Sequence, residues 1–190
     1  VGSELDNTGQ TDGTEDLQAL LDKAGSEGGG IVFLPGGNYR LDGSITIPSG
    51  VELKGSVDLG RIPFNIGSIL KVYGGKGEAD GTPTVKLSAN SGIRGIVFDY
   101  PEQQHLAKQN ETVQEYPYAM QGLGENIYIV NVSMRNAYNG LDLMTYRCDN
   151  HYVLYMAGFC LNNVIKVGSG ATGGVISNMQ FNSGALLTGA

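Results

Sequence analysis

Apolar and polar residues follow a helical period in only one stretch of the chain, residues 12–25. Its apolar residues recur at i, i+3, i+4 and i+7, and they are Leu17, Leu20, Leu21 and Ala24. Asp12 or Thr14 is a suitable N-terminal cap, and Gly25 is a suitable stop. The pattern therefore predicts one amphipathic helix near the start of the chain.

After this helix the apolar residues come in short runs of strand size. The first four runs are residues 31–34, 39–41, 45–47 and 51–53. Segments rich in glycine, proline, serine and aspartate separate them, which is the composition of tight turns. Because the separations are too short for a crossover helix, the pattern favours short strands joined by corners over βαβ units.

The second half of the chain repeats itself. Residues 126–132 align with residues 150–156 at an offset of 24 (150 − 126). Residues 139–143 align with residues 163–167 at the same offset (163 − 139). Two strand pairs that share one period indicate a coil of about 24 residues, stacked on the next coil as a β-solenoid.

Stacked coils bring equivalent residues together at about 4.8 Å in parallel sheets. The inward ladders that this predicts pair Leu141 with Ile165 and Leu143 with Val167. An antiparallel sandwich with accidental periodicity is the alternative. Residues 93–98 align with the later coil at an offset of 36 (129 − 93), and the excess of about 12 predicts an inserted loop within residues 100–125.

Residues 6–56 resemble the opening of the pectate-lyase-like β-helix superfamily. The resemblance rests on Gly28-Gly29-Gly30 before an apolar strand, on the Pro35-Gly36-Gly37 corner, on Tyr39, and on the segment Ile47-Pro48-Ser49-Gly50-Val51. It implies an all-β fold, a right-handed single-stranded parallel β-helix with an N-terminal capping helix. Residues 1–190 are expected to form a single domain that continues beyond residue 190, in a parent protein or on a second chain.

Composition and charge limit the kinds of partner that the chain can bind. The net charge is −7, so the chain lacks the basic stripe that binds a phosphate backbone, and we expect no nucleic acid partner. No apolar run approaches the roughly 18 residues of a membrane span. The resemblance implies a secreted or cell-surface protein. Cys148 and Cys160 are expected to be free thiols and not a disulfide framework.

In the superfamily that the chain resembles, substrate lies along one sheet, against side chains that point outward. Lys86, Asp142 and Lys166 stand between inward residues and are predicted to form such a column. The densest cluster of charged residues follows, and its candidate catalytic residues are Asp142, Arg147, Asp149 and His151. The alternative is that a corner carries these residues only to satisfy backbone groups.

Two reaction types remain open. Glycoside hydrolysis needs two carboxyl groups, which Asp142 and Asp149 could supply. A lyase needs a base and a cation that stabilises the enolate, roles open to His151, Arg147 or Lys166.

Candidate substrate-binding residues lie mostly in the predicted insertion, because tyrosine rings stack on sugars. They are Glu102, His105, Tyr116, Tyr118 and Lys166. No cofactor is predicted, since the acidic residues are too scattered for a clear calcium site.

The first functional hypothesis is an extracellular polysaccharide hydrolase or lyase. A second is a non-catalytic glycan-binding or tailspike-like stalk, which would be a homo-oligomer. The third is one chain of a split enzyme, in which a second chain covers the end of the β-helix that lacks a cap.

Overall fold

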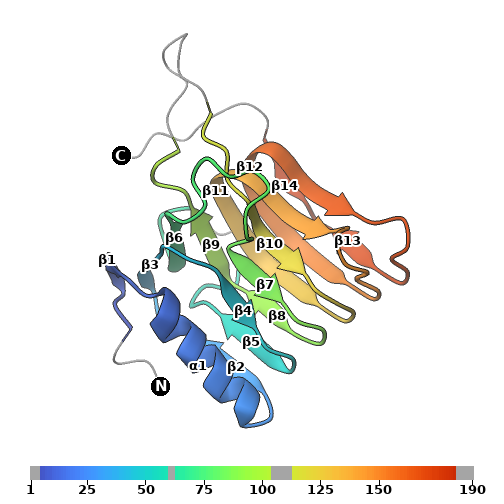
Figure 1. Cartoon of the computed structure of the whole chain (residues 1–190), viewed down its shortest axis with the longest axis horizontal. Helices are drawn as coiled ribbons and strands as arrows, with labels where there is room; N and C mark the ends of the chain where they lie inside the picture. The colour runs from blue at the N-terminus through green and yellow to red at the C-terminus, as the bar shows by residue number, and fades with distance from the viewer. Residues whose placement is uncertain (1–4, 60–62, 104–112, 183–190) are drawn as a thin grey trace.

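The computed structural model describes residues 5–59, 63–103 and 113–182. Within these ranges the chain forms one helix, α1 (Thr14–Ser26), and strands that wind into a right-handed parallel β-helix (Figure 1). No helix in the described ranges has the length and apolar composition to cross a membrane.

The strands form three faces of the solenoid, here called the first, second and third sheets. The first sheet contains β2 (Gly30–Phe33), β5 (Val51–Lys54), β8 (Gly92–Arg94), the beginnings of β11 (Tyr128–Leu143) and β12 (Tyr152–Val167), and β13 (Val175–Ser177). The second sheet contains β1 (Thr8–Asp12), β3 (Gly37–Leu41), β6 (Ser68–Val72), β9 (Ile96–Asp99), the middle parts of β11 and β12, and β14 (Gln180–Phe181). The third sheet contains β4 (Ile45–Ile47), β7 (Val85–Leu87), β10 (Tyr118–Gly122) and the ends of β11 and β12.

Strand pairing confirms the predicted coil. Every strand pair in the described ranges is parallel, which excludes the antiparallel sandwich. Leu141 pairs with Ile165 and Leu143 with Val167, at the predicted offset of 24 residues. The period was readable because β11 and β12 each turn through all three sheets without an insertion.

The core is a set of inward ladders that run along the solenoid axis. On the first sheet the ladder is Val32, Leu53, Ile93, Ile129 and Val153, all buried. Ile176 continues this ladder on β13 but is 39% exposed, because it belongs to the last described coil. Alternation along each strand sends the intervening residues outward.

Helix α1 covers the other end of the stack (Figure 1). Leu17 and Leu21 are fully buried against the first coil. The helix begins two residues later than predicted, with Gly13 as the N-cap residue. Neither Asp12 nor Thr14 occupies the N-cap position, although the Asp12 carboxylate accepts hydrogen bonds from the backbone N–H and hydroxyl of Thr14, the first residue of the helix. The predicted capping of the apolar bore is confirmed.

The predicted insertion at residues 100–125 is too long. Residues 118–122 form β10, a regular strand of the third sheet. The coil needs this third strand to pair with β7 and β11, so the extra residues fall before it. Residues 104–112, and with them His105, lie outside the described residues. A larger expansion, between β5 and β8, was not predicted from the repeat.

Asparagines line the corner between the third and first sheets. Asn90, Asn126 and Asn150 stack there with φ of 60°, 56° and 53°. The Asn126 amide donates to Asn90 Oδ1 at 2.9 Å, and the Asn150 amide donates to Asn126 Oδ1 at 3.2 Å. Asparagine suits this corner because it tolerates the left-handed conformation and bonds to its neighbours along the stack.

We expect Asn126→Ala to destabilise the chain by about 1 to 2 kcal/mol, because alanine is strained in the left-handed conformation and makes neither of the side-chain hydrogen bonds. Asn126→Gly should cost less, since glycine adopts this φ without strain. Urea denaturation measures both. Equal losses from the two substitutions would contradict the conformational explanation.

Candidate functional site

A column of polar side chains runs along the outer surface of the third sheet. The strand register aligns Thr46, Lys86, Gln121, Asp142 and Lys166. The predicted alignment of Lys86, Asp142 and Lys166 is confirmed by this register. Gln121, which the sequence analysis placed in an insertion, separates Lys86 from Asp142. We call these five residues the third-sheet column.

Asp142 is the most constrained member of the column. It is 2% exposed, and Gln121 Nε2 donates to its Oδ2 at 2.9 Å. The backbone N–H of Met144 and that of Thr145 donate to Oδ1 at 2.8 and 3.0 Å, and the Thr145 hydroxyl donates to Oδ2. Burial raises the pKa of Asp142, but the hydrogen bonds from Thr145 and Gln121 outweigh it and lower that pKa below 3.8.

Arg147 and Asp149 form an ion pair in the corner that follows. Arg147 Nε lies 2.7 Å from Asp149 Oδ2, and the Arg147 side chain is 67% exposed. Asp149 also accepts from the backbone N–H and hydroxyl of Thr172 on the next coil, at 2.8 and 3.1 Å. The Thr172 N–H bond is the largest cause of the lowered pKa of Asp149. The pair therefore joins two successive corners and leaves most of the guanidinium in solvent.

His151 is packed beneath the same corner. It is buried, and its Nδ1 lies 2.8 Å from the carbonyl oxygen of Cys148. Its ring fills the space beside Gly174, where a Cβ would overlap the imidazole. This position makes His151 a packing residue of the corner and unsuitable as a base that meets substrate. Cys148 and Cys160 are both free thiols, as predicted.

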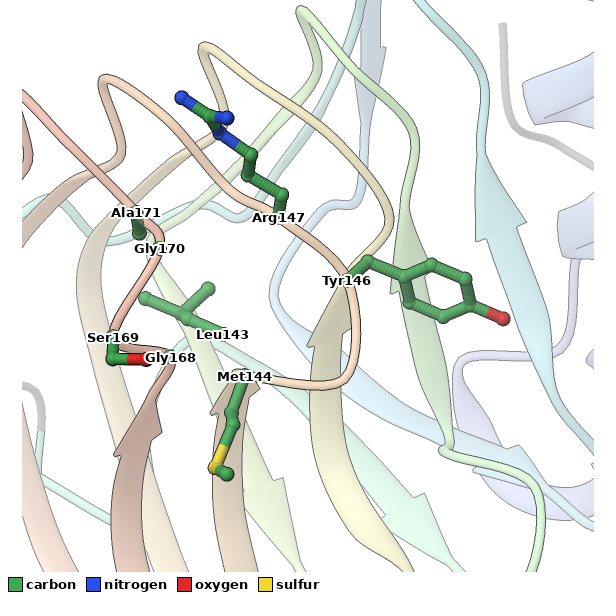
Figure 2. Close-up of a pocket in the computed structure, with 8 residues that line it drawn as sticks. All are labelled: Leu143, Met144, Tyr146, Arg147, Gly168, Ser169, Gly170 and Ala171. Atoms are coloured by element: carbon green, nitrogen blue, oxygen red, sulfur yellow. The ribbon is translucent and has the colours of Figure 1, made fainter.

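A small pocket lies between the two corners that extend from the third sheet (Figure 2). Its volume is about 200 Å³. The lining residues are Leu143, Met144, Tyr146, Arg147, Gly168, Ser169, Gly170 and Ala171. Figure 2 shows the side chains of Tyr146 and Arg147 directed away from the centre of this pocket. None of the residues of the third-sheet column lines this pocket.

Lys166 and Tyr118 meet on the same surface. The Lys166 ammonium lies 5.9 Å from the centre of the Tyr118 ring, within the range of a cation–π contact. Burial, with the nearby negative charges of Asp142 and Asp80, raises the pKa of Tyr118. The phenol thus keeps its proton at neutral pH. Both predicted substrate-binding residues stand beside Asp142, which the strand register places one coil from Lys166.

The other predicted binding residues lie elsewhere. Tyr116 is fully buried and packs edge-on against Tyr100, with ring centres 5.0 Å apart. Its ring belongs to the core, so the prediction that it lines a sugar subsite is wrong for this structure. Glu102 is half-buried at the surface, where Lys76 Nζ lies 3.4 Å from its carboxylate. No group of three or more histidine, cysteine, aspartate or glutamate side chains in the described ranges is arranged to hold a metal ion.

These features define a class of protein: a parallel β-helix with an ionisable column on one outer face. The chain belongs to the rhamnogalacturonase A/epimerase, pectate-lyase-like family, whose model matches residues 3–186. The match confirms the resemblance found in the opening residues.

Several known proteins similar to this chain come from Azotobacter vinelandii. Mannuronan C5-epimerase AlgE3 is 25% identical over 91% of this chain and 12% of its own length. Alginate lyase 7 is 42% identical over 25% of this chain and 6% of its own length. The solved A-module of mannuronan C-5 epimerase AlgE4 has a TM-score of 0.59 and 19% identity, over 95% of this chain and 48% of the module. The chain thus spans a small part of these curated relatives and about half of that module.

Asp142→Asn should destabilise the chain by about 1 to 3 kcal/mol near neutral pH, because the amide makes weaker bonds with Met144 and Thr145 and presents one oxygen where the carboxylate has two. Since the folded pKa of Asp142 lies below its ordinary value, the carboxylate stabilises the fold at neutral pH. That contribution is lost as the pH falls through the folded pKa, so the two proteins should converge in acid.

Denaturation midpoints between neutral pH and pH about 3 test this, with the exposed helix substitution Asp16→Asn as the control. A difference between Asp142→Asn and the unsubstituted chain that stays constant with pH would contradict the assigned ionisation.

Proposed function

We propose that this chain is part of a secreted enzyme that acts on an acidic polysaccharide along the third-sheet column, by removing the proton next to a uronate carboxylate. C5 epimerisation and lyase cleavage share this first step. In epimerisation a proton returns to C5 from the opposite side. In cleavage the bond from C4 to the glycosidic oxygen breaks, and the C4–C5 double bond forms.

The observation that carries the proposal is the placement of cations on one outer face of an acidic protein. The net charge is −7, yet Lys86 and Lys166 project from the third sheet, and Arg147 projects from its corner. Neither lysine forms an ion pair within the described ranges, because the oxygens of Asp142 are occupied by Gln121, Thr145 and Met144. The lysines are therefore available to a substrate carboxylate.

Each residue then has a distinct role. Lys166 binds the carboxylate of the reacting sugar and stabilises the charge that develops when its neighbouring proton leaves. Lys86, three strands from Lys166 by way of Gln121 and Asp142, and Arg147 hold further carboxylates along the polymer. The proton that leaves C5 passes to a water molecule, and Tyr118, which keeps its own proton, donates it to the leaving oxygen or to C5 and is reprotonated from solvent. Asp142 positions Gln121 and the corner.

The relatives support this chemistry over hydrolysis. A mannuronan C5-epimerase and an alginate lyase are both similar to this chain. Hydrolysis needs two carboxyl groups that face the glycosidic bond, one of them protonated. Asp142 and Asp149 both have lowered pKa values and bond to backbone N–H groups of their corners, an arrangement that favours a permanently ionised, structural carboxylate.

Incubation of the chain with polymannuronate in deuterated water tests the proposal. Epimerisation would introduce deuterium at C5, seen by NMR, and cleavage would give the ultraviolet absorbance of an unsaturated uronate. We expect Lys166→Gln to lower kcat/KM by about 10- to 100-fold, because one charge that stabilises the transition state is lost.

Lys23→Gln, on the exposed face of α1, is the matched control and should leave the rate unchanged. New reducing ends with neither deuterium uptake nor the absorbance of an unsaturated uronate would replace the proposal with hydrolysis. Binding of the polymer without any product would support the non-catalytic alternative.

A further inference from the structure

We infer that the outer face of the first sheet is a second sugar-binding surface, separate from the third-sheet column, which takes an uncharged pyranose chain by stacking on tyrosine rings. The surface is formed by Tyr128, Tyr152 and Tyr155, with Glu52 and Arg94 beside them. We call it the tyrosine surface.

The strand register places two of the tyrosines in one outward row. Tyr128 on β11 pairs with Tyr152 on β12, and on its other side with Gly92 on β8. A Cβ at residue 92 would overlap the Tyr128 ring, so the ring lies across the glycine along the sheet. The Tyr128 hydroxyl reaches Glu52, one coil further, and donates a hydrogen bond to its carboxylate. Gly92 therefore creates the space that holds this ring against the sheet.

Tyr155 occupies a position that suits other residues better. Its φ is +56°, and the equivalent residues on neighbouring coils are Gly95, Asn131 and Asn178, which also have positive φ. Glycine and asparagine adopt this conformation easily, whereas a bulky residue does so at a cost. Tyr155 is 38% exposed, so packing in the core offsets little of that cost. A strained, exposed aromatic residue is typical of a binding surface.

Spacing and charge identify the ligand. Successive coils are about 4.8 Å apart, close to the length of one sugar residue in an extended chain. Arg94 near the rings faces two carboxylates, since it lies 3.4 Å from Glu52 and 3.8 Å from Asp58. Because Arg94 is held by two carboxylates, this group of charges does not attract a polymer carboxylate. Ring faces and paired polar groups suit the C–H face and hydroxyls of a neutral pyranose.

Titration with a mannose oligosaccharide, which has the ring of mannuronate without its carboxylate, tests the inference by NMR. We expect binding that changes little between low and high salt, because the oligosaccharide carries no charge. Tyr152→Ala and Tyr155→Asn should each weaken it by about five- to tenfold. Tyr155→Asn should at the same time raise the denaturation midpoint. A higher midpoint would show that the weaker sugar binding of this variant does not come from unfolding.

Tyr146→Ala is the matched control, since Tyr146 is 49% exposed and Tyr152 is 43% exposed, on different faces. Lys166→Gln should leave mannose-oligosaccharide binding intact, so this surface and the proposed function fail independently. Unchanged affinity in both Tyr152→Ala and Tyr155→Asn would overturn the inference, as would wild-type binding that disappears at high salt. Self-association of the chain that Tyr152→Ala abolishes, without sugar binding, would assign the surface to a second copy instead.

Discussion

Parallel hydrogen bonding between successive coils is the constraint on which the rest of the molecule depends. Each strand must find its partner one coil away, so equivalent residues are forced into straight ladders. Inward ladders become the core, and α1 closes one end of it with Leu17 and Leu21. Outward ladders are equally regular. A charged or aromatic residue at an outward position therefore lies in line with the equivalent residues of the neighbouring coils.

The corners maintain this regularity through hydrogen bonds between polar side chains and backbone groups. Asn90, Asn126 and Asn150 bond to one another along one corner. Asp149 bonds to Thr172 on the next coil, and Asp142 holds the turn that leaves the third sheet. Carboxylates occupied in this way are stable anions with lowered pKa, better suited to positioning neighbours than to exchanging protons.

Two outer faces differ in the interaction that they offer. The third sheet presents Lys86 and Lys166, which favour a polyanion and respond to salt. The first sheet presents tyrosine rings whose neighbouring charges are paired, which favours stacking.

Local patterns predicted a helix near residues 12–25, the 24-residue coil and the outward alignment of Lys86, Asp142 and Lys166, because side-chain alternation and turn composition are local signals. It did not determine the burial of Tyr116, the strand β10, or the partners of Asp142 and His151. Those depend on how corners of unequal length bring distant residues together, and no local period encodes that path. The left-handed conformation of Tyr155 was likewise decided only by the stack, since the register of its coil imposes a corner where the sequence has no glycine or asparagine.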